Sequence, residues 1–274
     1  GMTAYFDDHL CVRAGVLSPR DYLTVLSGHA EAMVKSPGRL EQPLSAASFD
    51  AWIRFYRPDE NTRNSTQNYY SNGALLAVTL DSRIRAATDG DRSLDDFMRL
   101  MWQRARPDGY DCEMVTACLD EASGGLEFES MLRELVDGPF EPTLPTAFAV
   151  SGLDASWKAS EPLIGVQFRA GSLAIASVMH GGPAWEAGIA PGDELLALDG
   201  LRVESLTWGT VFAAIAKPDR PLSVLLSRRG RIDTIDVAPV RSETGQFKIS
   251  ASATASESEL ALREGWLGPA SRQL

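Results

Sequence analysis

Two patterns of hydrophobic and polar positions divide this chain. Up to about residue 140, apolar side chains recur every three to four residues, as they do on one face of an α-helix. In 22–34 the positions with this spacing are Tyr22, Leu23, Val25, Leu26, Ala30, Met33 and Val34. The preceding "SPRD" places Ser18 at the N-cap, Pro19 at the first helical position and Asp21 at the third. We therefore predict a helix that begins at Pro19.

Further helices are predicted in the same half. The stretch "SFDAWIRFY" places Phe49, Trp52, Ile53 and Tyr56 at helical spacing, and "PDENTRNST" then reads as a loop. The stretch "NGALLAVTLDSRIR" is nearly apolar in its first half, so we expect a long helix with that half buried. Ser93 caps the next helix. Two more helices are expected at 111–122 and 127–137, with Gly124 and Gly138 as stops.

From about residue 161 the pattern is that of short strands bounded by glycine, proline and aspartate, such as "LAIASVM" and "LSVLLSRRG". Helical pieces interrupt them at "PAWEAG" and "SLTWGTVFAAIA". Three prolines in "GPFEPTLPTAF" indicate a linker between the halves, and "ETGQFKISASATASES" reads as extended and mobile. We expect a helical lobe at 1–142, a linker at 143–160, a β-rich domain at 161–241, and an extended tail with a short terminal helix at 242–274.

Composition narrows the function classes. The chain has 274 residues, enough for about two domains. Its net charge of −11 argues against a nucleic-acid partner, which requires a basic face. No apolar run approaches the ~20 residues of a membrane span, so we expect a soluble chain. The sequence leaves its compartment open between the cytoplasm and the periplasm. An odd number of cysteines argues against a disulfide framework and favours buried small hydrophobes: Cys11, Cys112 and Cys118. The histidines have no helical-pair spacing and are expected to pack rather than bind metal: His9, His29 and His180.

The stretch "GGPAWEAGIAPGDELLALDGLRV" resembles the PDZ domain of bacterial proteases, and the resemblance covers about 161–240. Pro183 begins a one-turn helix, Gly188 provides a left-handed stop, and Asp199-Gly200 is a tight hairpin signal. Trp185 departs from the family, which has a small or polar residue there, and we expect it to contact the other half.

The PDZ resemblance implies a groove that binds peptides or protein C-termini along a sheet edge beside a helix. The stretch "LIGVQF" corresponds to the binding strand, with Gly165 in the loop whose backbone N–H groups receive a terminal carboxylate. The helix at 205–216 faces this strand. The expected groove residues are Leu163, Ile164, Gly165, Val166, Phe168, Trp208, Val211 and Phe212, with Leu206 as a further wall. The alternative is that these apolar side chains are only core.

The first half resembles the region downstream of the zinc motif in glycyl aminopeptidase-type metallopeptidases, which end in a PDZ domain. The matching stretches are "GMTAYFDDHLCVRAG", "SPRDYL", "SPGRLEQPLSAASFDAWIRFYRPDENTRN", "YYSNGALLAVTLDSRIR", "SLDDFMRLMW" and "LALREGWLG". In that family the zinc site is a His-Glu-x-x-His helix and a later Glu, directly before Gly-x-Thr-x-Tyr. Gly1 corresponds to that glycine. The resemblance therefore implies the C-terminal part of a zinc aminopeptidase, with zinc in the parent protein and no metal ligand, cofactor or activity in this chain alone.

One catalytic candidate remains. In the wider superfamily, the tyrosine of a Tyr-x-Lys-Gly motif donates its O–H to the tetrahedral intermediate. The stretch "YYSNG" places Tyr70 in that register, with Asn72 where lysine is usual. Spacing alone favours Tyr69 and Tyr70 as packing residues at a helix start, whereas the resemblance favours a catalytic Tyr70.

The resemblance implies a multidomain α plus β fold, in which the all-α lobe of a thermolysin-like peptidase domain precedes a PDZ domain. The missing N-terminal lobe of the same protein is expected to cover the face around Tyr5, Tyr70 and 57–66. Without that lobe we expect a homodimer or a neighbour packed there. The alternative function is a non-catalytic peptide-binding protein whose helical lobe is only structural.

Overall fold

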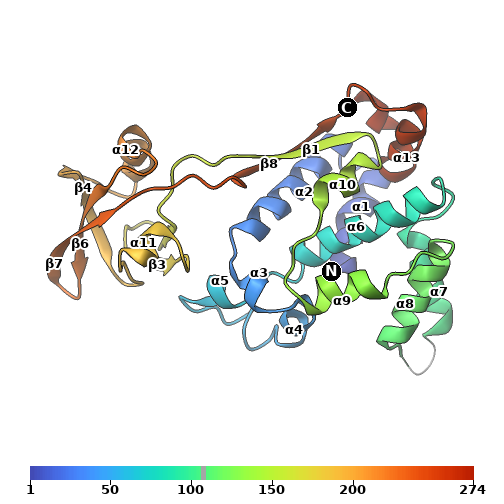
Figure 1. The fold of residues 1–274 in the computed structure, drawn as a ribbon, viewed down its shortest axis with the longest axis horizontal. Helices are drawn as coiled ribbons and strands as arrows, with labels where there is room; N and C mark the ends of the chain where they lie inside the picture. Colours follow the sequence, from blue (N-terminus) through green and yellow to red (C-terminus); the bar gives the residue numbers. More distant parts are fainter. Residues whose placement is uncertain (106–108) are drawn as a thin grey trace.

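The computed structural model describes residues 1–105 and 109–274 (Figure 1). A helical lobe and a smaller β domain occupy opposite ends of an elongated molecule, and two long segments of chain connect them. The helices of the helical lobe are α1 (Met2–Arg13), α2 (Pro19–Val34), α3 (Gly38–Glu41), α4 (Leu44–Phe49), α5 (Thr62–Ser65), α6 (Ser71–Ala87), α7 (Leu94–Arg104), α8 (Cys112–Ala122), α9 (Glu129–Asp137), α10 (Leu144–Ala149) and α13 (Glu257–Leu267), the last followed by a 3-10 turn at Pro269–Gln273.

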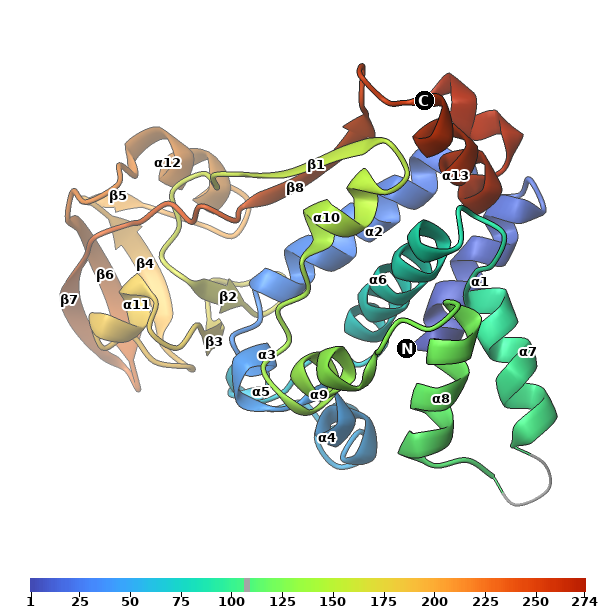
Figure 2. The ribbon, with the colours of Figure 1, turned by 45° about the vertical axis from the view of Figure 1, so that its right-hand side comes forward.

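Helix α6 is the centre of the helical lobe, between α1 and α2 (Figure 2). It also contacts α7 and α10. All of its residues from Ser71 to Ser82 are buried. The predicted burial of its first half is therefore confirmed. A helix that is apolar all round is stable only where other helices surround it, as they do here.

Side-chain caps fix where two of these helices begin. The Ser18 hydroxyl accepts a hydrogen bond from the Asp21 backbone N–H at 3.1 Å, and Pro19 occupies the first helical position. Ser93 and Asp96 form a reciprocal capping box at the start of α7. Because these contacts are local in the sequence, both helix starts could be predicted, and both are confirmed.

A buried polar network joins four helices around Asp81 of α6. The Asp81 carboxylate accepts hydrogen bonds from the Tyr5 hydroxyl at 2.8 Å, from Arg85 Nε at 2.8 Å and from the Leu94 backbone N–H at 2.6 Å. Trp266 of α13 donates its indole N–H to the Tyr5 hydroxyl at 3.2 Å. Tyr5 is only 1% exposed, so the expectation that it lies on an open face was wrong.

The apolar stripe after α4 does not form the predicted helix. Helix α4 ends at Phe49, and 50–56 form turns. Phe49, Trp52 and Ile53 are 89%, 79% and 70% exposed. Short helices in proteins depend on packing of their apolar face, and no described element covers this one. Cysteine burial also differs from the prediction, because Cys118 is buried but Cys112 is exposed.

The two segments expected to be a linker and a mobile tail pair with each other. Strand β1 (Leu153–Lys158) runs antiparallel to β8 (Gln246–Ala251), from Leu153 opposite Ala251 to Lys158 opposite Gln246. We call this pair the ribbon. Phe247 is 2% exposed, with its ring centroid 4.7 Å from that of Trp157. Strand β8 packs on α2, so one face of the ribbon lies on the core of the lobe.

The ribbon and α13 make the division of the chain different from the one predicted. The helical lobe includes β1, β8 and α13, and is therefore not all-α. Trp266 and Leu267 of α13 are buried in its core. The prolines of the expected linker lie before and at the start of α10, with Pro145 in its first turn, where proline is compatible with a helix.

The β domain contains strands β2 (Val166–Phe168), β3 (Ile175–Val178), β4 (Glu194–Leu198), β5 (Leu201–Arg202), β6 (Leu222–Arg228) and β7 (Arg231–Val237), with helices α11 (Pro183–Glu186) and α12 (Trp208–Ile215). Strands β5-β4-β6-β7 form one antiparallel sheet in that order, and β2 pairs with β3. Asp199 and Gly200 both have positive φ in the tight turn between β4 and β5. Buried Asp193 accepts two hydrogen bonds from Arg228, at 2.8 and 2.7 Å, and one from the Ala190 N–H at 2.9 Å.

Direct contacts also join the two domains. Asn64 of α5 donates to the Val178 carbonyl at 2.9 Å, and its side-chain oxygen accepts from the His180 N–H at 2.9 Å. Trp185 packs edge-on against His180 and borders a hollow whose other wall includes Gln42 and Asn64 of the lobe. Within the described ranges, no helix is both long and apolar enough to cross a membrane.

Candidate functional sites

Tyr70 lies immediately before α6 and is 41% exposed. Its hydroxyl is hydrogen-bonded to the hydroxyl of Tyr56, which also lies 3.0 Å from the hydroxyl of Tyr69. The ring of Phe55 packs against those of Tyr69 and Tyr70. We call Tyr56, Tyr69 and Tyr70 the tyrosine cluster. Sequence reasoning did not find Tyr56, because its place here depends on the turns at 50–56.

Hydrogen bonding shifts the pKa values of this cluster in opposite directions. Hydrogen bonds from Tyr56 and then Tyr69 lower the pKa of Tyr70, because they stabilise its phenolate. The same network raises the pKa of Tyr69, chiefly through its bond to Tyr56. In both contacts either hydroxyl can be the donor. In the arrangement in which Tyr69 donates to Tyr56 and Tyr56 donates to Tyr70, the O–H of Tyr70 is left to donate to an acceptor outside the cluster.

The first residue of the chain lies beside the start of α6. A Cβ added to Gly73 would stand 2.3 Å from the Gly1 Cα, so the two glycines permit a close approach of α1 and α6. Gly73 follows Tyr70 by three positions. Asn72 between them is 1% exposed and donates to the Gln67 side-chain oxygen at 2.7 Å. Asn72 therefore supports the loop before α6 from inside the protein.

The described residues do not contain a metal site. No group of three His, Cys, Asp or Glu side chains among them is arranged to hold an ion. His9 is buried, with Nε2 2.7 Å from the Trp266 carbonyl oxygen, and its burial lowers its pKa. His180 lies at the domain junction against Trp185. The donor set of residues 1–105 and 109–274 therefore does not fit a zinc site.

A second candidate site is a cavity of about 340 Å³ between β2, α12 and the helical lobe. We call it the groove. It is lined by Val34, Lys35, Arg63, Ser160, Pro162, Leu163, Ile164, Gly165, Val166, Phe168, Met179, Trp208, Phe212, Ser242, Thr244 and Gly245. The lining combines an apolar floor with a few polar groups, which is typical of ligand sites.

The structure brings seven of the eight predicted groove residues to this cavity. The exception, Val211, packs against the core of the β domain, and Leu206 is 94% exposed and does not line the groove. The rings of Phe168 and Trp208 are in edge-to-face contact, with centroids 4.9 Å apart, and Phe212 stacks on Trp208. Ile164 is only 2% exposed, so its side chain is core.

The loop before β2 presents unpaired backbone donors to the groove. The Leu163 N–H donates to the Val240 carbonyl at 2.9 Å, but the N–H groups of Ile164 and Gly165 have no acceptor within the described residues. Gly165 has φ of +81°, a conformation that glycine adopts without strain. Adjacent free N–H groups of this kind bind anions.

Three residues of the helical lobe also line the groove: Val34, Lys35 and Arg63. Burial lowers the pKa of the Arg63 guanidinium. Sequence reasoning missed these residues, because they lie far from the PDZ-like stretch along the chain. No local motif indicates that α2 and α5 come to the mouth of that groove.

Two parts of the chain match models of known protein families. Residues 1–76 match the model of the M61 glycyl aminopeptidase family, and 175–228 match that of the PDZ domain. The chain combines an M61 glycyl aminopeptidase segment with a PDZ domain. Tyr70 lies within the M61 segment, and β3, β4, α12 and β6 lie within the matched PDZ range. A comparison with curated proteins gives no match.

Among solved structures, an aminopeptidase N family protein from Idiomarina loihiensis has a TM-score of 0.87 at 23% identity, over 98% of this chain and 48% of its own. This chain therefore shares the fold of that structure and spans about half of its length. An HtrA-type protease with a decapeptide has a TM-score of 0.27 at 19% identity, over 35% of this chain and 31% of its own. A photosystem II D1 C-terminal processing protease has a TM-score of 0.26 at 13% identity, over 62% of this chain and 43% of its own.

Proposed function

We propose that this chain is the C-terminal part of a zinc-dependent aminopeptidase that hydrolyses N-terminal peptide bonds, with a PDZ domain that binds peptides or protein C-termini. The observation that carries the proposal is the tyrosine cluster, in which the exposed hydroxyl of Tyr70, inside the M61 segment, is hydrogen-bonded to Tyr56. A neutral O–H donor fixed in this way is suited to stabilise a developing oxyanion.

The zinc ligands of the family do not occur in this sequence, and the His, Cys, Asp and Glu side chains that the structure describes form no group arranged to hold a metal. Zinc in such enzymes polarises the scissile carbonyl and activates a water. The part proposed for this chain is that Tyr70 donates a hydrogen bond to the carbonyl oxygen as its negative charge develops. The close approach of Gly1 and Gly73 supports this role, because the family's third ligand directly precedes the residue at Gly1.

The surface beside the tyrosine cluster supports a neighbour at this site. Phe49, Trp52 and Ile53 are exposed, and Trp52 packs on Tyr56 with ring centroids 5.1 Å apart. Exposed apolar patches commonly mark interaction surfaces. We propose that the remaining part of the catalytic domain covers them and that this face associates with another copy when it is left open.

The test uses the full-length gene product, an amino-acid anilide substrate and the variant Tyr70→Phe. We expect kcat to fall by roughly 10²–10³ with little change in KM, since the donor acts on charge that forms only during the reaction. Tyr69→Phe removes a hydroxyl two steps from the acceptor and should cost much less. Tyr110→Phe, at a residue that is 69% exposed on the distant α7–α8 side, is the neutral control. Full activity in Tyr70→Phe would contradict the proposed role.

The present chain alone should retain no stoichiometric zinc after dialysis and should not cleave the anilide. Metal analysis and the same assay measure both properties. One tightly bound zinc per chain together with turnover would overturn the proposed division of the active site.

A further inference from the structure

The groove carries a cation that belongs to the helical lobe. Arg63 is partly buried, and its Nε donates to the Lys35 carbonyl at 2.5 Å, at the C-terminal cap of α2. The negative end of the helix dipole stabilises a cation at this position. The two Nη groups of Arg63 make no hydrogen bond or ion pair with any described residue. The hydrogen bond at Nε thus fixes the side chain, and the N–H groups on its two Nη atoms can still donate to a ligand.

The charges around the groove are unbalanced. No aspartate or glutamate lines it among the described residues. Of its two cations, Lys35 lies 3.5 Å from the Glu31 carboxylate, whereas Arg63 has no carboxylate partner in the described structure. Transferring an unpaired charge from water to a partly buried site is unfavourable unless an anion compensates it. The groove therefore fits a ligand that has an apolar body and a negative end.

The domain junction fixes Arg63 relative to the strand that forms the groove. Asn64, the next residue, bonds to the Val178 carbonyl and the His180 N–H at the end of β3, which pairs with β2. Gly38 of α3 lies so close to the Thr66 backbone that an added Cβ would stand 2.1 Å from its oxygen. Close packing on both sides of α5 therefore holds Arg63 in place.

We propose that the carboxylate site of the groove is composite, with the backbone N–H groups of Ile164 and Gly165 from the PDZ domain and the guanidinium of Arg63 from the M61 segment binding the C-terminal carboxylate of one peptide. The inference rests on the proposed peptide binding by the PDZ domain. Arginine suits this task because its planar fork matches both oxygens of a carboxylate. The helical lobe then contributes to selection of free C-termini over internal segments.

The test measures binding of fluorescein-labelled peptides to the 274-residue chain by fluorescence polarisation. The probe is a pool with randomised upstream positions and a fixed C-terminal leucine, prepared with a free carboxylate and, separately, as the amide. We expect Arg63→Gln to weaken binding of the carboxylate pool by about tenfold or more, as loss of a charged hydrogen bond does. Binding of the amide pool should be unchanged, and Arg63→Lys should retain part of the preference for the free carboxylate.

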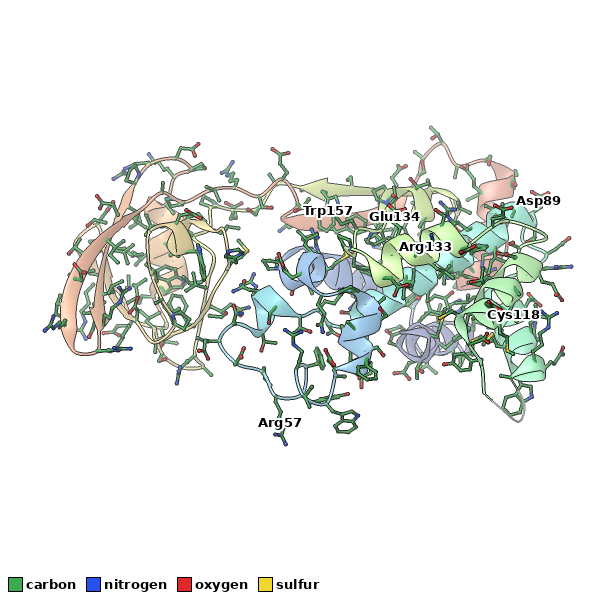
Figure 3. The ribbon with its side chains drawn as sticks, turned by 60° about the horizontal axis from the view of Figure 1, so that its bottom comes forward. Arg57, Asp89, Cys118, Arg133, Glu134 and Trp157 are labelled. Atoms are coloured by element: carbon green, nitrogen blue, oxygen red, sulfur yellow. The ribbon has the colours of Figure 1, made fainter. Side chains whose placement is uncertain are left out.

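The matched control is Arg57→Gln. Arg57 is an exposed arginine before the same short helix, and Figure 3 shows it pointing away from the molecule. Binding in this variant should equal that of the unmodified chain. If the unmodified chain binds the carboxylate pool and Arg63→Gln binds it equally well, or loses both pools equally, the composite site is refuted while peptide binding stands. If neither pool binds the unmodified chain, the proposed PDZ function fails as well.

Discussion

Replacement of Asp81 by asparagine tests whether the buried network organises the helical lobe. The Asp81 and Arg85 side chains are 2% and 8% exposed, and their contact is 2.8 Å long. The asparagine keeps the size of the side chain but removes the charge that compensates Arg85. Removing one partner of a buried ion pair costs about 3–5 kcal/mol, because the other charge stays buried without compensation. We expect a loss of this size in the free energy of unfolding.

Two further variants separate charge from hydrogen bonding. Tyr5→Phe leaves Asp81 with two donors but removes the acceptor of the Trp266 N–H, and should cost about 1–2 kcal/mol. Asp81→Asn combined with Arg85→Met removes both charges, and most of the loss should be recovered.

The assay is urea unfolding followed by far-UV circular dichroism. The slope of the unfolding free energy against urea concentration is compared among the variants, because an equal slope shows that each variant exposes the same amount of surface on unfolding. The control is Glu129→Gln, which breaks an equally short ion pair with Arg133 on the surface of α9, where the side chains are 71% and 75% exposed. Figure 3 labels Arg133. We expect no measurable change there. A loss below about 1 kcal/mol in Asp81→Asn, or no recovery in the double variant, would refute the reasoning.

Three other predictions concern the supports of the two sites. Gly38→Ala should destabilise the chain by roughly 1–3 kcal/mol in urea unfolding because its Cβ meets backbone, whereas Gly28→Ala has open space within α2 and should be neutral or stabilising by up to about 1 kcal/mol. The PDZ domain should lose stability in acid. Burial of Asp193 by itself raises its pKa, but the hydrogen bonds and charge of Arg228 and the Ala190 N–H together outweigh it, so the pKa of Asp193 is lowered. The stabilisation is therefore present above the unfolded-state pKa and disappears as pH falls through the lower folded value. Unfolding of Asp193→Asn should lack this component of the pH dependence, and an unchanged profile would contradict it. Tyr56→Phe should raise the pKa of Tyr70 toward its ordinary value. A pH titration of tyrosinate absorbance measures this shift, and the Tyr70→Phe variant identifies the part of the absorbance that belongs to Tyr70.

Local signals made much of the helical lobe predictable. The Ser18 and Ser93 caps depend on contacts within three residues, so the sequence alone places the starts of α2 and α7. The apolar run of α6 indicated its central position. The PDZ turns at Gly188 and Asp199-Gly200 are likewise fixed by backbone conformation at single positions.

The errors come from contacts between distant parts of the chain. Strand β1 finds its partner in β8 only after the intervening PDZ domain, so each strand alone resembled a linker or a tail. The helical spacing of Trp52 and Ile53 was real, but nothing in the described structure covers that face. A motif search cannot find Arg63 either, because this groove residue lies outside the PDZ stretch and reaches the groove only through a contact between distant parts of the chain.

The ribbon gives the PDZ domain the topology of an insertion. Lys158 and Gln246 are paired neighbours, and residues 159–245 leave and re-enter the lobe between them. An unfolded segment of about 87 residues would oppose pairing of β1 with β8 through loop-closure entropy, with a length-dependent contribution of roughly 4 kcal/mol. A folded PDZ domain holds its own ends together and removes most of that cost. Folding of the inserted domain therefore stabilises the helical lobe from a distance, and substitutions that unfold the PDZ domain should also loosen β8 and α13.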